Sequence, residues 1–458
     1  MTIRTVLKKA VSLCLAVSLS VAFAITPGAV NFLNVFNDGV AIIPAGGHFG
    51  HPVLDKNGKV VIPADKYRFG STFGGGGFHD NLAVVSFEAG GKYVGLGVID
   101  TKANVVVKPG VYSDISDFSD GAAVVSNEYG RLGVINTKGK LVVPLGEYKS
   151  IRRFDSGVAV FKNKYDEFGV IDKAGKIIVK PGEYVSISDF VDGLSFAATK
   201  GGTGLTGVIN NKGKLIFDGL RSSRAVINDG MIRAEDDIGA KTTKYLIDKN
   251  GKIVYETSSR DGYVNSYNDG VAVINEGYSS ATKLYPHSII DKTGKTVGSF
   301  QLKKNIGVSA KFNDGLLVTT YPEIAVIDKT GKFIVETGTY DTISDFRDGL
   351  AVCTKNKRVL AIDKTGKVVI NPEKYDRIAN IGDGVLLVES KDEKNVNRIG
   401  LVDKTGKLIV KLGTYDNIYD FNGGVAIVRK QKVEKNIYTE YYGVIDKTGK
   451  LAAPLVRF

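Results

Sequence analysis

Short runs of alternating apolar and polar residues, separated by turns that contain glycine, fill the chain after about residue 30. In residues 340–346 the side chains alternate with a period of two, which suits a pleated strand better than a helix. Asp348-Gly349 then predicts a hairpin, because glycine accepts the positive φ that such turns require. Three further runs follow, at 350–354, 359–362 and 368–370. The pattern therefore predicts a unit of four short β-strands.

Two series of turns repeat this unit along the chain. The first, an Asp-Gly-like turn, recurs about every 34 to 45 residues, around Gly39, Asn81, Gly121, Gly157, Gly193, Gly230, Gly270, Gly315, Gly349, Gly384 and Gly424. The second, an Asp-Lys-Thr-Gly-Lys-like turn, begins at Asp55, Asp100, Asn136, Asp172, Asn210, Asp248, Asp291, Asp328, Asp363, Asp403 and Asp446. The two series alternate without a slip, and no helical periodicity interrupts them. Self-similarity of this kind indicates an all-β fold, a tandem array of about eleven four-stranded units.

The number of units leaves the closure of the array open. A four-stranded meander is typical of a propeller blade, but propellers usually have about 4 to 8 blades. The array is therefore either propeller-like, with one or two rings, or an open β-superhelix in which each unit packs only on its neighbours. The least regular copies lie in residues 201–323, which we expect to hold any seam between two rings.

The N-terminal residues have the pattern of an export signal. Three basic residues, Arg4, Lys8 and Lys9, precede an apolar stretch that ends in Ala22-Phe23-Ala24. About 15 apolar residues are too few to span a bilayer, so residues 1–24 are expected to be a signal peptide cleaved after Ala24, with the repeat region at 25–458. This predicts a secreted or cell-surface protein whose mature chain has no transmembrane segment. The one remaining thiol, Cys353, lies in an apolar strand and is expected to be buried.

The repeated pattern resembles the WG-repeat family of bacterial exported proteins. It reads as aromatic-x-x-Gly-Leu-Ala-Val, then Gly-Val-Ile-Asp-Lys-x-Gly-Lys, then apolar-apolar-x-Pro, then Tyr-Asp-x-Ile, as in Gly169 to Lys176 and in Pro181 to Phe190. The family's Trp is absent, and its place before Gly is taken by Leu96, Leu132, Phe168, Thr206, Ile399 and Tyr442. The resemblance implies a repeat protein that binds or scaffolds, without a defined ligand.

The lysines of the second turn are the main candidate for a binding surface. One Asp and two Lys are a poor calcium loop, which needs about six to eight oxygen ligands, whereas Asp and Gly suit a type I turn. The chain has a net charge of +12, and equivalent turns of a repeat fall on one side, so the lysines predict a basic rim. Such a rim attracts anionic cell-wall polymers, glycans or another envelope protein. The alternative is that lysine only keeps the turns soluble and prevents edge pairing. The candidate residues are Lys173, Lys176, Lys292, Lys295, Lys329, Lys332, Lys364, Lys367, Lys404, Lys407, Lys447 and Lys450.

No other motif predicts chemistry. His48, His51 and His79 are close enough in sequence for a zinc site, but this arrangement occurs once and depends on how residues 70–78 fold. The sequence offers no paired nucleophile and base, no cofactor motif and no nucleic-acid-binding signature. We therefore expect a non-enzymatic binding or scaffold protein of the bacterial cell envelope, without a cofactor. The alternatives are a carbohydrate-active hydrolase or lyase on a propeller-like scaffold, and a purely structural surface protein.

Overall fold

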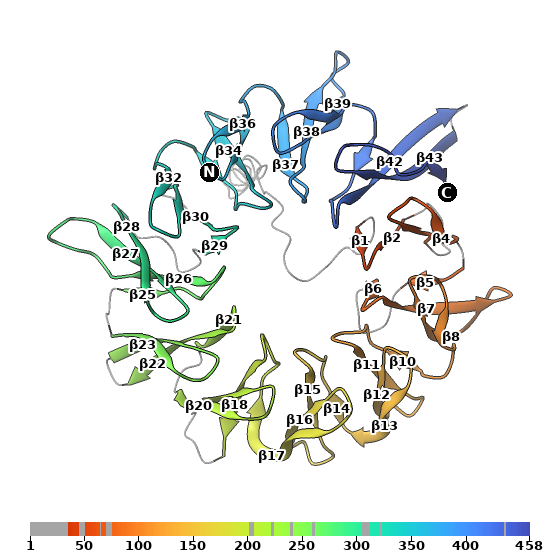
Figure 1. The fold of residues 1–458 in the computed structure, drawn as a ribbon. Helices are drawn as coiled ribbons and strands as arrows, with labels where there is room; N and C mark the ends of the chain where they lie inside the picture. The colour runs from red at the N-terminus through yellow and green to blue at the C-terminus, as the bar shows by residue number, and fades with distance from the viewer. Residues whose placement is uncertain are drawn as a thin grey trace, which may run out of the picture. The chain divides into compact units, whose positions relative to one another are not determined.

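The computed structural model describes residues 35–44, 51–64, 66–69, 76–200, 206–220, 224–238, 241–258, 262–304, 311–319, 323–434 and 437–458, all within the compact body Phe32–Phe458. The predicted signal peptide and its cleavage at Ala24 lie outside these residues. Within them the chain forms no helix, and every strand pair is antiparallel (Figure 1). The all-β prediction is therefore confirmed. None of the described segments is a helix suited to crossing a membrane.

The strands are grouped into eleven repeats of four, and their positions within a repeat are called strands 1 to 4. The first strands are short: β1 (Phe36–Asn37), β10 (Asp114–Ile115), β14 (Ser150–Ile151), β21 (Val226–Asn228), β25 (Tyr263–Val264), β29 (Phe312–Asn313), β33 (Thr342–Ile343), β37 (Arg377–Asn380) and β41 (Asn417–Ile418), while β5 (Arg68–Phe69) and β6 (Phe78–His79) share this place in repeat 2. The second strands are β2 (Val40–Ile42), β7 (Leu82–Ala89), β11 (Ala122–Ser126), β15 (Val158–Lys162), β18 (Leu194–Thr199), β22 (Met231–Ile238), β26 (Val271–Asn275), β30 (Leu316–Val318), β34 (Leu350–Lys355), β38 (Leu386–Lys391) and β42 (Val425–Glu434).

The third and fourth strands complete each meander. The third strands are β3 (Val53–Asp55), β8 (Lys92–Asp100), β12 (Leu132–Asn136), β16 (Phe168–Asp172), β19 (Thr206–Asn210), β23 (Lys241–Ile247), β27 (Tyr285–Asp291), β31 (Val326–Asp328), β35 (Arg358–Asp363), β39 (Asn397–Val402) and β43 (Ile437–Asp446). The fourth strands are β4 (Val60–Ile62), β9 (Val105–Val107), β13 (Leu141–Tyr148), β17 (Ile177–Ile187), β20 (Leu215–Leu220), β24 (Ile253–Thr257), β28 (Thr296–Leu302), β32 (Phe333–Val335), β36 (Val368–Ile370), β40 (Leu408–Val410) and β44 (Val456–Arg457). Strand β17 also serves as the first strand of repeat 5, so repeats 4 and 5 share one sheet.

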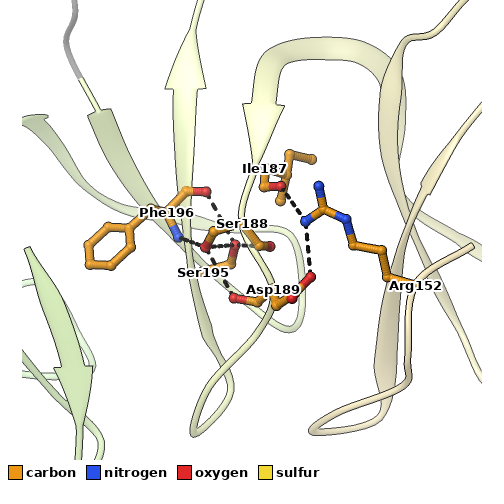
Figure 2. A network of polar contacts seen from close by, with 6 residues as sticks. All are labelled: Arg152, Ile187, Ser188, Asp189, Ser195 and Phe196. Atoms are coloured by element: carbon orange, nitrogen blue, oxygen red, sulfur yellow. Dashed lines mark hydrogen bonds and ion pairs between the residues drawn. The ribbon is translucent and has the colours of Figure 1, made fainter. Parts of the chain in front are cut away.

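The first strand is shorter than its alternating sequence predicts. Residues 340–346 suggest a strand of seven residues, but β33 contains only Thr342 and Ile343. Beyond them the Ser344 hydroxyl accepts the hydrogen bond from the Val352 amide, so a side chain replaces the backbone carbonyl in the ladder. Figure 2 shows the same device in repeat 5, where Ser188 Oγ accepts the amide of Phe196 at 3.0 Å.

The hydrophobic core is divided into eleven clusters among the described residues, each at the boundary between two neighbouring repeats. One of these clusters joins the two ends of the array, because Phe36 and Leu54 of repeat 1 pack with Ile427 and Tyr442 of repeat 11. At the same boundary the Asn422 side-chain amide donates to the Phe36 carbonyl oxygen at 2.7 Å. The last repeat therefore packs against the first, and the series of eleven repeats is closed.

Smaller residues fill the core where the resembled family has Trp. Leu96 and Tyr442 are buried within the clusters, and Phe168 and Ile399 pack against them. Cys353 is buried and free, as predicted, and burial raises the pKa of its thiol to about 12.

The glycine of the second turn is required by both conformation and space. Gly331 and Gly366 have φ values of 87° and 80°, which confirms the predicted left-handed conformation. A Cβ atom on Gly331 would lie 1.9 Å from the Ser299 carbonyl oxygen, on the fourth strand of the preceding repeat. The turn is thus pressed against its neighbour, and a side chain there would separate two repeats.

We expect Gly331→Ala to destabilise the protein more than Gly338→Ala. Gly338 also has a positive φ, 77°, but no atom lies within 4 Å of its Cβ position. The control substitution should therefore cost only the backbone strain of about 1 to 2 kcal/mol. Gly331→Ala should cost a further 1 to 3 kcal/mol, roughly, through overpacking. Equal free energies of unfolding for the two variants, measured in denaturant, would contradict the close approach between repeats.

A buried histidine makes the stability depend on pH. His287 is 1% exposed, stacks on Phe300 with ring centroids 4.7 Å apart, and its Nε2 lies 3.0 Å from the Asn275 side-chain nitrogen. Burial lowers the pKa of His287 from 6.5 to about 4. The folded protein therefore holds this ring neutral at a pH where the unfolded chain binds a proton.

We expect the free energy of unfolding to fall as the pH is lowered from 6.5 to about 4, because protonation of His287 favours the unfolded chain. The contribution is up to about 3 kcal/mol, is fully present above pH 6.5 and is lost progressively below it. His287→Gln should have a flatter profile across this window. Parallel profiles for the parent and the variant, from denaturant titrations at several pH values, would exclude His287 as the cause.

Candidate functional site: the lysine turns

The aspartate of the second turn accepts hydrogen bonds from backbone amides of the same turn. In repeat 8, Asp328 Oδ1 accepts hydrogen bonds from the amides of Thr330 and Lys332 at 2.8 and 3.1 Å, and the Gly331 amide donates to the Asp328 carbonyl oxygen. The Thr330 hydroxyl donates to the same carboxylate oxygen at 2.6 Å. In repeat 7 the equivalent hydroxyl, that of Thr293, is the main cause that lowers the pKa of Asp291. These bonds form the turn that the sequence predicts, and they occupy the carboxylate oxygen that a cation would need.

The Asp-Gly turn between strands 1 and 2 joins one repeat to the next. Asp229 and Gly230 have φ values of 55° and 69°, as a type I′ turn requires. Asp229 Oδ2 accepts the amide of Gly270 in the following repeat at 2.7 Å. The same link, from an aspartate to the next turn, is formed by Asp38, Asp80, Asp120, Asp192, Asp229, Asp269, Asp314, Asp348 and Asp383. We call this series the aspartate links.

The first lysine of the second turn pairs with an aspartate link of the preceding repeat. Four of the six candidate lysines at this position form such ion pairs, with Nζ to carboxylate distances of 3.2 Å for Lys173–Asp120, 2.7 Å for Lys292–Asp229, 3.3 Å for Lys329–Asp269 and 3.1 Å for Lys364–Asp314. Lys404 and Lys447, the other two, form no ion pair within the part of the chain that is described. Four of the first lysines therefore help to hold neighbouring repeats together.

Repeats 4 and 5 show that these two positions change together. Ser156 replaces the aspartate, and its hydroxyl accepts the Gly193 amide at 2.9 Å. Asn211 replaces the lysine, and its side-chain amide donates to the Ser156 carbonyl oxygen at 2.9 Å. A neutral pair thus replaces an ion pair while the contact between the two repeats is kept.

The second lysine of the turn has a different environment. Lys176, Lys295 and Lys332 are exposed, as are the other members of this position, Lys59, Lys140, Lys214, Lys252, Lys367, Lys407 and Lys450. Repeat 2 alone has a different residue at this position, Asn104. Within the described residues none of the ten forms an ion pair, and only their backbone amide and carbonyl groups are used in the turn. We call these ten residues the outer lysines.

Both kinds of turn lie at the same end of the sheets. In an antiparallel meander, the connection between strands 1 and 2 and the connection between strands 3 and 4 leave from one end, and the connection between strands 2 and 3 leaves from the other. The ion pairs between the two kinds of turn confirm this placement. We call the end with the turns the lysine end and the opposite end the hairpin end.

We expect Asp314 and Lys364 to be energetically coupled. Asp314→Asn removes the charge but keeps an acceptor for the Gly349 amide and a residue that tolerates a positive φ. Because both side chains are partly exposed, the coupling in a double-mutant cycle with Lys364→Met should be below about 1 kcal/mol and should shrink in high salt. The cycle is measured by thermal or denaturant unfolding. Strictly additive effects at low salt would show that the pair contributes nothing to stability.

The histidine candidates do not form a metal site in the described part of the chain. His48 lies outside the described residues. His51 is partly buried, and this burial lowers its pKa. His79 Nε2 lies 3.9 Å from Asp117 Oδ2. Among the described residues no group of three or more His, Cys, Asp or Glu is arranged to hold a metal ion.

Two electrostatic interactions near the first strands, one of them a direct contact, are absent from the sequence predictions. Arg152 Nη1 donates to the Ile187 carbonyl oxygen and to Asp189 Oδ1 of the next repeat, at 3.0 and 2.9 Å (Figure 2). Burial raises the pKa of Asp420, and the charge of Arg347, two repeats away, opposes this shift. The sequence does not predict either interaction, because the residues involved differ from the repeated pattern or lie far apart in the sequence.

A shallow surface pocket lies at the hairpin end of repeat 10. It has a volume of about 470 Å³ and is lined by Ser390, Lys391, Asp392, Arg398, Leu412 and Gly413. Arg398 and Asp392 pair with each other across it, with Nε and Oδ2 2.8 Å apart. Two of the three charged groups of this pocket are therefore paired with each other, and Lys391 is exposed.

The sequence matches a family model described as "WG containing repeat" at residues 97–129, 133–165, 168–202, 325–358, 361–394 and 399–432. The search of curated proteins found no match.

Solved structures with a similar course of the chain have low identity. One is described as a eukaryotic initiation factor, with 10% identity and a TM-score of 0.36 over 71% of this chain and 93% of that one. Dipeptidyl peptidase 4 of Porphyromonas gingivalis has 10% identity and a TM-score of 0.32 over 78% and 62% of the two chains. A protein of unknown function from Bacteroides caccae has 13% identity and a TM-score of 0.21 over 46% and 90%.

Proposed function

The chain belongs to the WG-repeat family, and on this basis we propose that it is an exported, non-enzymatic binding or scaffold protein of the bacterial cell envelope. Its ligand in this proposal is an anionic polymer, such as a phosphate-containing cell-wall polymer or an acidic glycan, which the outer lysines contact. Export is supported by the basic and apolar residues at positions 1–24.

The outer lysines are the observation that carries the proposal. A lysine occupies the same turn position in ten of eleven repeats, always exposed and always at the lysine end. Since the first lysines are mainly paired with aspartates, the outer lysines supply most of the unpaired positive charge there. Regularly spaced charges on a rigid scaffold suit a polymer whose own charges repeat.

The non-enzymatic part of the proposal is supported by how the polar groups of the turns are used. The aspartates of both turn series accept backbone amides, and four also pair with lysines. A carboxylate that holds the backbone in this way is a poor general base, because the oxygen that accepts the backbone amides is not free to take a proton from a substrate. The turns are therefore suited to display charge rather than to transfer protons.

We expect reversal of five outer lysines in adjacent repeats, Lys295, Lys332, Lys367, Lys407 and Lys450, each to Glu, to weaken binding to immobilised polyphosphate by at least about tenfold at low salt. Binding by the parent should fall as salt rises, because exposed charges are screened beyond about 8 Å at physiological ionic strength. The melting temperature should change little, since these side chains make no described ion pair. A single reversal should have only a small effect.

The matched control reverses five exposed lysines at the hairpin end, namely Lys92, Lys355, Lys357, Lys391 and Lys394. It changes the net charge by the same amount, so it separates a local surface from the field of the whole molecule. The proposal predicts that the control keeps most of the affinity. Equal loss in both variants, or undiminished binding after reversal of the outer lysines, would assign these lysines to solubility alone.

A further inference from the structure

The exposed tyrosines are confined to one end of the sheets. Among the described residues the most exposed large apolar side chains include five tyrosines, all at the hairpin end: Tyr129, Tyr165 and Tyr278 lie in connections between strands 2 and 3, and Tyr93 and Tyr438 are the second residues of the third strands β8 and β43. None of the five lies at the lysine end. Two of the rings have a neighbour, because Lys164 Nζ lies 5.0 Å from the ring centre of Tyr165 and the rings of Tyr278 and Tyr285 have their centres 5.3 Å apart. The restriction of these exposed rings to one end of the sheets still indicates a use there.

Three of these tyrosines occupy the same position in consecutive repeats. Tyr93, Tyr129 and Tyr165 are 36 residues apart, in repeats 2, 3 and 4, and are 63%, 76% and 70% exposed. Each stands three residues before the position of Leu96, which pairs with the second strand. The closely related hairpins of repeats 3 and 4 hold the backbone of the tyrosine directly, because Asn127 and Asn163 accept its amide, at 3.1 and 2.9 Å. The backbone at Tyr129 and Tyr165 is therefore fixed in the same way in the two repeats.

The charges around these tyrosines do not favour an anionic ligand. The three hairpins, residues 88–93, 127–131 and 163–167, contain three basic and four acidic residues. Part of this charge is already neutralised, since Glu88 pairs with Arg68 at 2.9 Å and Asp166 with Lys149 at 2.6 Å. This surface thus differs from the lysine end, where the outer lysines have no such partners. Its ligand should be close to neutral.

The arrangement also fits an extended ligand better than a protein. Charged residues are depleted at the centre of protein interfaces, whereas here charged residues adjoin each tyrosine in sequence or lie one residue away. An aromatic ring with polar neighbours can stack on the flat C–H face of a sugar while the neighbours bind its hydroxyl groups. β-linked glucose and N-acetylglucosamine polymers repeat such a face along their length, so rings on several repeats can engage one chain.

We propose that Tyr93, Tyr129 and Tyr165 form a binding surface for a neutral β-linked polysaccharide. This surface is separate from the outer lysines and does not depend on them. Each ring stacks on one sugar, and the paired charged groups between the rings form hydrogen bonds with sugar hydroxyl groups. The affinity of each contact is small, and binding depends on several rings engaging one chain at once.

The test measures co-sedimentation of the full mature chain with microcrystalline cellulose and with chitin. The parent is expected to bind at least one of them, with little dependence on salt. Replacing all three tyrosines by Ala should weaken binding by at least about tenfold, because all the stacking contacts are lost at once. Replacement by Phe should keep most of the affinity, since the ring is retained.

A matched control replaces three exposed apolar residues of the same repeats, Val105, Leu141 and Ile177, by Thr. These lie at the start of the fourth strands, next to the lysine turns, and their replacement should leave binding unchanged. The proposal is overturned if the parent binds neither polymer or if the alanine variant binds as well as the parent. It is also overturned if the alanine variant loses only self-association in size-exclusion chromatography, which would make the surface an interface between copies. Steep salt dependence would assign the binding to the outer lysines instead.

Discussion

The hydrogen bond that the amide of one turn donates to the aspartate of the preceding turn is the contact on which the arrangement of the repeats depends. A charged acceptor makes such a bond worth about 1.5 to 3 kcal/mol, more than a neutral one. It also orients one turn relative to the next, because the Gly270 amide donates to Asp229 while both turns have the left-handed backbone of a type I′ turn. Hydrophobic clusters between repeats supply most of the buried area but no orientation of this kind. The aspartate links therefore set how neighbouring repeats are placed at nine of the eleven boundaries.

The boundary between the last repeat and the first lacks this link. Gly423 occupies the aspartate position there, so no carboxylate is available. Other contacts replace it: Asn422 donates to the Phe36 carbonyl oxygen, and Lys56 Nζ lies 3.4 Å from the Gly423 carbonyl oxygen. The Asn contact has counterparts at other boundaries, such as Asn228 to Tyr267, while the hydrophobic cluster is of the usual kind. A repeat array must cover its two terminal faces, and here they cover each other.

The sequence predicts the repeats far better than it predicts the contacts between them. The two turn series give the four strands, their order and the positive φ of Gly331, because each depends on residues close in sequence. The partner of Lys173 lies 53 residues away, and no periodicity shows which of two lysines in a turn reaches it. One feature of the sequence does indicate this pairing: Ser156 and Asn211 replace the aspartate and the first lysine together at one boundary. The length of a strand is also hard to predict from the sequence. Alternation in residues 340–346 predicts a longer strand than β33, because the Ser344 hydroxyl takes the place of a backbone carbonyl and ends the ladder.

The separation of lysines from tyrosines follows from the even number of strands in each repeat. With four antiparallel strands, a repeat enters and leaves at the same end, so equivalent turns of all repeats share one end. An odd number would place them alternately at the two ends and mix the two chemistries. Repeat 2 tests this constraint, because its sheet has five strands. Strands β5 and β6 both pair with β7, so they divide one position between them, and the chain still passes through four positions. The tyrosine of that repeat, Tyr93, consequently lies at the same end as Tyr129, and its second turn lies at the other.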